Sequence, residues 1–126
     1  MTPGIVLSSL ILVASAAALA RADEAGDKFF QDKILPRLKQ HCFECHAQDA
    51  EDVKGGLLLD TRAGLRAGGD SGEIIIPGEP EGSLLIQALR YAEDDRQMPP
   101  RGKLDQAIID DFVKWVTDGA PDPRQE

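Results

Sequence analysis

The first twenty residues of this chain contain no Asp, Glu, Lys or Arg, so every charged side chain lies in residues 21–126. Cations are also few, with 14 Lys and Arg against 22 Asp and Glu and a formal net charge of −8. A general nucleic-acid binder needs clustered cations, and anionic membrane surfaces attract basic segments. The charge balance therefore excludes nucleic acid as a partner and argues against an anionic membrane surface.

Cysteine and histidine are scarce, with two of each in 126 residues. All four lie in one string, which runs from His41 to His46 and contains Cys42 and Cys45. A disulfide between Cys42 and Cys45 would close so small a loop that it would stabilise the fold only weakly. A tetrahedral zinc site is also disfavoured, because neighbouring residues cannot easily point at one ion from four directions.

Residues 5–20 form an uncharged, mostly apolar run that is shorter than the about 20 residues needed to span a bilayer comfortably. The run ends in Ala-Leu-Ala at residues 18–20, a tripeptide that signal peptidases accept, and Ala-Arg-Ala follows at residues 20–22. We predict a secretory signal peptide over residues 1–20, although no Lys or Arg precedes the apolar run. An uncleaved membrane anchor is the alternative. In both cases a single domain of residues 21–126 is delivered outside the cytoplasm, as to a periplasm.

The string Cys42-x-x-Cys45-His46 has the order and spacing of a covalent haem-attachment site. Two thiols three residues apart on a helical turn can each bond one vinyl-derived carbon of a haem. The imidazole that follows can then bind the iron from one side. A thiol–disulfide exchange site is the weaker alternative, because that chemistry favours a strand before the motif and residues 27–41 have a helical pattern.

The apolar periodicity predicts two longer helices. Residues 27–41 carry one apolar stripe, and the helix either kinks at Pro36 or restarts with Pro36 in its first turn. Residues 105–118 give the strongest amphipathic pattern in the chain, and Gly119 is expected to end that helix.

Shorter elements are expected between and after these helices. Asp60 is a plausible N-cap for a short helix through Leu65, and Ser83 for an amphipathic helix that closes at Tyr91. Residues 47–54 read as a polar loop. Pro121-Asp122-Pro123 is expected to stop the helix and to be followed by a short frayed end.

An iron bound by His46 has a second axial position, and few residues can fill it. The initiator methionine leaves with the signal peptide, and His41 lies too close to the cysteines to reach the far face of the haem. Met98 remains, followed by two prolines whose fixed φ would stiffen the loop that presents its thioether. His/Met ligation raises the reduction potential and suits outer-sphere electron transfer. The alternative is a methionine that fills a gap in the core.

With these residues in place, the chain resembles the planctomycete-type cytochrome c domain, which is similar to class I monohaem c cytochromes. The matching strings occur in the same order from about residue 27 to 121: Leu35-Pro36, His41-Cys42-Phe43-Glu44-Cys45-His46, Gly55-Gly56-Leu57-Leu58-Leu59-Asp60, Gly68-Gly69-Asp70-Ser71-Gly72, Pro77-Gly78-Glu79-Pro80, Ser83-Leu84-Leu85, Met98-Pro99-Pro100 and Trp115 to Ala120. The resemblance implies an all-α, cytochrome c-like fold. In that fold the N- and C-terminal helices pack around one covalent haem c and are joined by long irregular loops.

The resemblance also implies thioether links at Cys42 and Cys45, axial ligands His46 and Met98, and a haem pocket lined in part by residues 55–60. The candidate pocket-lining residues are Leu57, Leu59, Pro99 and Trp115.

Several other side chains have two interpretations. Trp115 either contacts the haem or, with Phe112, belongs to the core. Tyr91 either donates to a haem propionate or only caps its helix. Class I cytochromes often have an aromatic residue where this chain has Leu38, so a different register is expected where the first and last helices cross. The candidate cations for the propionates are Arg62, Arg66, Arg90, Arg96, Arg101 and Lys103.

These features predict an exported monohaem c-type cytochrome that transfers single electrons and is not an enzyme. Two alternatives remain: a haem domain with a labile sixth ligand, acting as a sensor or with peroxidase-like activity, and a fixed electron-relay subunit of a larger complex. The acidic pairs Asp94-Asp95 and Asp110-Asp111 are either a solvated face or a docking patch. We expect redox partner proteins with a basic or neutral docking face, binding that weakens with salt, and membrane contact only through an uncleaved N-terminal segment.

Overall fold

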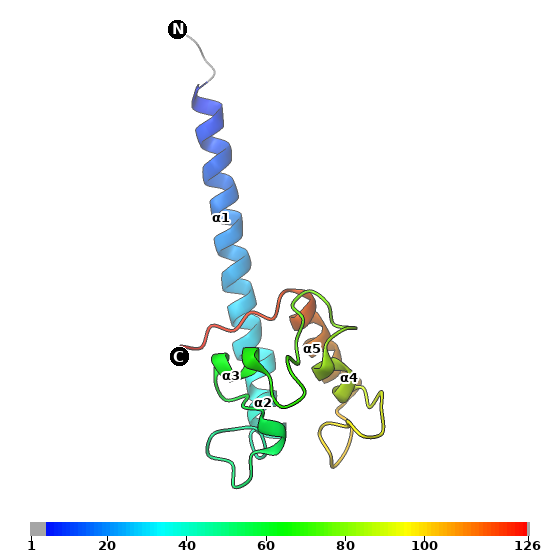
Figure 1. The fold of residues 1–126 in the computed structure, drawn as a ribbon. Helices are drawn as coiled ribbons and strands as arrows, with labels where there is room; N and C mark the ends of the chain where they lie inside the picture. Colours follow the sequence, from blue (N-terminus) through cyan, green and yellow to red (C-terminus); the bar gives the residue numbers. More distant parts are fainter. Residues whose placement is uncertain (1–4, 126) are drawn as a thin grey trace.

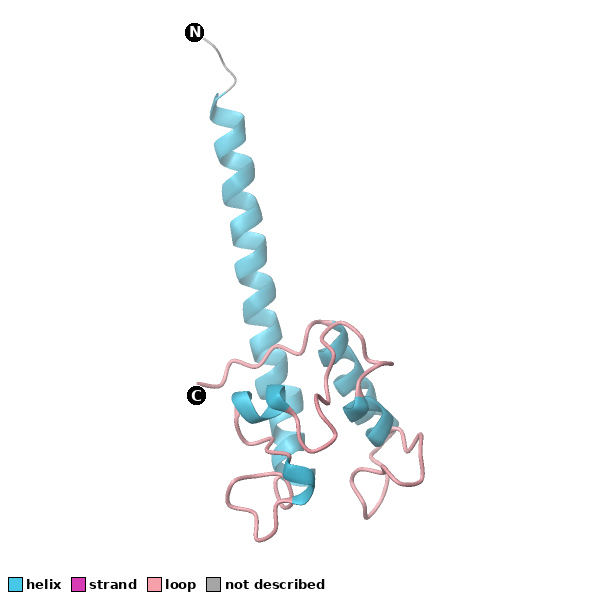
Figure 2. Ribbon diagram, in the orientation of Figure 1, coloured by secondary structure: helices cyan, strands magenta, loops and turns pink. Residues whose placement is uncertain are grey.

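The computed structural model describes residues 5–125, and these residues form helices joined by long irregular segments (Figure 1). The elements are α1 (Ile5–Phe29), η1 (Phe30–Ile34), α2 (Leu35–His41), η2 (Lys54–Gly56), α3 (Arg62–Ala67), α4 (Leu84–Leu89) and α5 (Gln106–Thr117). The described residues contain no strand, and Figure 2 shows helices and loops alone. One isolated bridge pairs Gly69 with Gly72. The predicted all-α class is confirmed.

Helix α1 extends away from the rest of the domain (Figure 1). It continues without a break across residue 20, and the side chain of Leu19 is 69% exposed. Within residues 15–125, whose side chains the structure describes, no helix combines the length and the apolar character needed to cross a membrane. The start of the predicted signal peptide, residues 1–4, lies outside the described residues.

The helix predicted over residues 27–41 changes its winding just before Pro36. The N–H of Leu35 donates to the carbonyl of Phe30, five residues earlier, so η1 is a π-helical turn. Pro36 then lies in the first turn of α2, where its missing N–H costs no hydrogen bond. The second of the two alternatives for Pro36 is therefore the observed one, and η1 joins α1 to α2.

The core centres on the packing of η1 against α5. The ring centroids of Phe30 and Trp115 lie 5.8 Å apart, and those of Phe112 and Trp115 lie 6.2 Å apart with the rings edge to face. All three side chains are buried, as is Leu38. Phe30 therefore supplies the aromatic contact between the first and last parts of the domain, and the aliphatic Leu38 fills the core one helical segment later.

The prediction of a frayed end directly after Pro123 is wrong at Arg124, because residues 121–124 pack onto the core. Trp115 Nε1 donates to the carbonyl of Pro121 over 2.8 Å. The carboxylate of Asp122 is buried and accepts from the Arg124 guanidinium, which also donates to the carbonyl of Leu59 over 2.8 Å. The tail crosses α1 in Figure 1. The ion pair and the Trp115 hydrogen bond hold it in place.

The cap predicted for the third helix is wrong by one residue. Thr61 is the N-cap of α3, and its Oγ1 accepts from the N–H of Gly64 over 3.0 Å. The carboxylate of Asp60 is used elsewhere, since its Oδ2 accepts from the N–H of Gln48 over 3.0 Å. Asp60 therefore ties the start of α3 to the segment that follows the cysteine motif.

Ser83 occupies the N-cap position of α4 but does not cap the helix with its side chain. Its buried hydroxyl accepts from the N–H of Ile76 over 2.9 Å and donates to the carbonyl of Glu79 over 2.8 Å. Ser83 thus closes the turn that precedes α4. The final helix, α5, matches its predicted span to within one residue at each end.

Candidate functional site

Residues Cys42 to His46 form a single helical turn at the end of α2. The carbonyl of Cys42 accepts from the N–H of Cys45 over 3.2 Å and from the N–H of His46 over 2.9 Å. Residues three apart on such a turn lie on one face. Both thiols are free. The turn therefore provides two neighbouring thiols followed at once by an imidazole, which is the donor set that covalent haem attachment needs.

The competing chemistries for these cysteines lack their structural context. The segment before Cys42 is the helix α2 and not the strand that a thiol–disulfide exchange site favours. Within residues 5–125, no group of three or more His, Cys, Asp or Glu side chains is placed to hold a metal ion directly.

A backbone hydrogen bond ties His46 to the segment of residues 55–60. The N–H of Leu59 donates to the carbonyl of His46 over 2.7 Å, so the segment after the motif runs beside the Gly-Gly-Leu-Leu-Leu-Asp segment. The imidazole Nδ1 of His46 is buried and has no hydrogen-bond partner. Such an orphaned buried atom is uncommon in native proteins and fits a side chain whose function depends on a further group.

Burial raises the pKa of the Cys42 thiol from its ordinary 9.0 to about 11, and the nearby Cys45 adds to this rise. The Cys42 thiol therefore holds its proton more tightly in the folded chain than in the unfolded chain. Because the unfolded state loses this proton first, ionisation of Cys42 lowers the stability of the haem-free protein as the pH rises from about 9 to 11.

The raised pKa predicts slow alkylation of Cys42 in the folded, reduced, haem-free protein. The thiolate is the reactive form, and a rise from 9.0 to about 11 lowers its population at pH 8 about a hundredfold. Iodoacetamide should therefore modify Cys42 about a hundredfold more slowly in the folded protein than in urea, as measured by peptide mass spectrometry. Equal rates in the two states would contradict the raised pKa of Cys42.

Two hydrogen bonds anchor the loop that carries Met98, one at Met98 itself and one at the following residue, Pro99. The N–H of Met98 donates to the carbonyl of Ala88 in α4 over 3.1 Å. The hydroxyl of Tyr91 donates to the carbonyl of Pro99, so Tyr91 braces this loop. Its φ of 55° also ends α4, as expected of a helix-closing residue. The side chain of Met98 is 37% exposed, which is not the position of a core gap-filler.

An ion pair connects this loop to the cysteine motif. Arg101, three residues after Met98, donates from its Nη2 to the Oε1 of Glu44 over 3.3 Å. Glu44 lies between the two cysteines. Both side chains are exposed, so the pair contributes less than about 1 kcal/mol to stability. The ion pair does show that the motif turn and the Met98 loop lie side by side.

The predicted pocket-lining residues differ in burial. Leu59 and Trp115 are buried, and Leu57 and Pro99 are half-buried. Trp115 contacts Phe30 and Phe112 and donates to the tail, which supports its interpretation as a core residue. Among the candidate propionate partners, Arg90 pairs with Glu81 over 2.8 Å and Arg101 pairs with Glu44.

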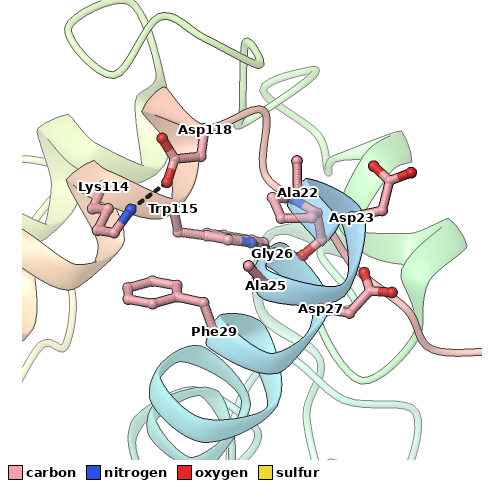
Figure 3. A pocket seen from close by; sticks show the side chains of 10 residues that line it. Ala22, Asp23, Ala25, Gly26, Asp27, Phe29, Lys114, Trp115 and Asp118 are labelled. Atoms are coloured by element: carbon pink, nitrogen blue, oxygen red, sulfur yellow. Dashed lines mark hydrogen bonds and ion pairs between the residues drawn. The ribbon is translucent and has the colours of Figure 1, made fainter. Parts of the chain in front are cut away.

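A separate pocket lies between α1 and α5 (Figure 3). Its lining residues are Ala22, Asp23, Ala25, Gly26, Asp27, Phe29, Lys114, Trp115, Asp118 and Pro121. In Figure 3 Lys114 points toward Asp118, and the Nζ–carboxylate distance is 2.5 Å. Neither cysteine, His46 nor Met98 lines this pocket. It is therefore not the site that the motif would use.

The helical domain and its Cys42–His46 turn have the features of a c-type cytochrome. Residues 42–102 match the family model for Planctomycete cytochrome C, a span that runs from the first cysteine of the motif through the Met98 loop. This match supports a planctomycete-type cytochrome c domain over these residues and, with it, haem-based electron transfer. Comparisons with the curated proteins and with the solved structures found no match.

Proposed function

We propose that this protein is an exported cytochrome that carries single electrons on one covalently bound haem c. The observation that supports this most directly is the Cys42–His46 turn within the matched span, with two free thiols and an imidazole on one helical turn. When bound, the haem supplies one-electron chemistry by alternating between ferric and ferrous iron. Cys42 and Cys45 hold it by thioether bonds, and His46 binds one side of the iron.

Met98 is the proposed second axial ligand. Three features support this assignment: its thioether is partly exposed, its loop is anchored to Ala88 and Tyr91, and the Arg101–Glu44 ion pair lies between that loop and the motif turn. A thioether is a weak ligand for iron, so the protein must hold it in place. Two filled axial positions suit electron transfer and disfavour substrate binding at the iron.

The proposed partners are redox proteins with a basic or neutral docking face. Asp94, Asp95 and Asp110 are exposed, and the chain carries a net charge of −8, to which two propionates would add negative charge. Such a surface speeds encounter with a cationic partner and loses this advantage at high salt. The uncharged residues 1–20 support export to a periplasm or a similar compartment, with a membrane anchor as the alternative.

A potentiometric titration of the purified holoprotein, followed by its optical spectrum, tests the carrier function. We expect a reversible one-electron transition, and in the ferric form a methionine-to-iron charge-transfer band that azide does not remove. A high-spin ferric spectrum that shifts with azide would contradict the carrier and support an open iron site, as in a sensor or a peroxidase-like protein. Isolation only as part of a stable complex would instead favour the fixed electron-relay subunit.

A further inference from the structure

Within residues 15–125, whose side chains the structure describes, two buried side-chain atoms have no hydrogen-bond partner, and both belong to the same region. They are Nδ1 of His46 and Oδ1 of Asp60. Buried polar atoms in native proteins are nearly always paired, so each such atom calls for an explanation. An imidazole N–H is a donor and a carboxylate oxygen is an acceptor, so the two atoms are chemically complementary.

The backbone brings these two residues into adjacent segments. The N–H of Leu59 donates to the carbonyl of His46 over 2.7 Å, and the N–H of Gln48 donates to Oδ2 of Asp60 over 3.0 Å. These two hydrogen bonds hold residues 46–48 beside residues 59–60. The second one also fixes the carboxylate by one oxygen and leaves Oδ1 as the free acceptor.

The neighbouring backbone acceptors are already in use. The carbonyl of Cys42 accepts from Cys45 and His46, the carbonyl of Cys45 accepts from Lys54, and the carbonyl of His46 accepts from Leu59. A histidine that binds a metal through Nε2 carries its proton on Nδ1 and normally donates it to a carboxylate, a carbonyl or water. Among these groups, Asp60 has the unused oxygen.

We propose that Asp60 is a positioning residue, whose Oδ1 accepts the Nδ1 proton of His46 when Nε2 binds the haem iron. This inference rests on the proposed function. The hydrogen bond would fix the tautomer and ring orientation of His46 and would make the imidazole a stronger donor to iron. A stronger donor favours the ferric state, so Asp60 lowers the reduction potential of the protein.

The test compares Asp60→Asn with Asp110→Asn in the holoprotein. Both substitutions remove one carboxylate charge, but Asp110 is exposed on α5 and has no role near His46. We expect Asp60→Asn to shift the ferric–ferrous equilibrium about tenfold toward the ferrous form, which is about 59 mV for a one-electron couple. Asp110→Asn should produce a much smaller, salt-dependent shift.

A proton NMR experiment on the ferrous wild-type protein gives a second, independent result. The Nδ1 proton of His46 should show a nuclear Overhauser effect to the β-protons of Asp60 and slow exchange with solvent. Slow exchange should be lost in Asp60→Asn. If Asp60→Asn does not bind haem, the wild-type NMR result decides alone.

Equal potential shifts in the two variants, or a His46 Nδ1 proton with no contact to Asp60 in the wild type, would overturn the role of Asp60. These results reject the positioning role alone if the wild type still shows a one-electron transition with His46 bound to iron. Absence of haem from the wild type would instead reject the proposed function.

Discussion

Replacing Met98 with alanine is expected to abolish the methionine-to-iron charge-transfer band completely and to lower the reduction potential. The substitution removes the only thioether within residues 5–125, and alanine offers no group that can bind iron. The ferric spectrum of Met98→Ala should become high-spin, or should show a replacement ligand, and should shift when azide is added. Absorption spectra with and without azide measure the effect.

Ile76→Ala is the matched control for this substitution. Ile76 is also an apolar side chain at the surface, 42% exposed against 37% for Met98, and it lies in a different loop. The control should leave the spectrum and the azide response unchanged. A Met98→Ala protein that keeps its charge-transfer band would show that another group fills the second axial position.

Replacing Arg124 with alanine should lower the free energy of unfolding by about 3–5 kcal/mol. The Arg124 side chain is 15% exposed and the Asp122 side chain is 0% exposed, and the guanidinium donates to both carboxylate oxygens over 2.7–3.1 Å. It also lies 5.1 Å from the Phe30 ring centroid and donates to Leu59. Its removal would leave a buried carboxylate and a carbonyl without their partner.

Guanidinium chloride unfolding of Arg124→Ala beside Arg90→Ala measures this effect. Arg90 also pairs with a carboxylate, that of Glu81, but the Glu81 side chain is 78% exposed. Truncation of Arg90 should cost about 0–1 kcal/mol. Equal losses in the two variants would contradict the packed tail and favour the frayed tail that the sequence predicts.

The sequence predicts the helices well where apolar periodicity is strong. The spacing of Ile109, Phe112 and Val116 defines one face of α5, and those side chains are buried in the structure. The errors occur where a polar side chain has more than one use. Asp60 is a good cap by residue type, but its carboxylate bonds to Gln48, and Thr61 caps α3 instead. Residue type alone does not choose between local and distant hydrogen bonds.

The tail shows the same difficulty for charged residues. A sequence with Pro121, Asp122 and Pro123 indicates an end to helix, and a charged pair two residues apart is ordinarily solvated. The burial of the Asp122–Arg124 pair depends on the carbonyl of Leu59 and the ring of Phe30, which come together only after folding. No local pattern could have indicated these contacts.

Some residues of the candidate site can be predicted from a local motif, whereas others are brought to the site only by the fold. Cys42, Cys45 and His46 are close in sequence, so their motif indicates the chemistry without any fold. Met98 is distant in sequence, and its proximity to the motif is supported here by the Arg101–Glu44 contact. Asp60 stands inside one of the strings that carry the family resemblance. Its relation to His46 emerges only from the backbone pairing of the two segments.

The central claim is that Cys42 and Cys45 hold one haem covalently, and the intact mass of the exported protein under denaturing conditions tests it most directly. The wild type should have the mass of its polypeptide plus one haem, because thioether bonds survive denaturation. The Cys42→Ser/Cys45→Ser variant should have the mass of its polypeptide alone and no haem absorbance. A wild-type protein at the mass of the bare polypeptide would contradict the account.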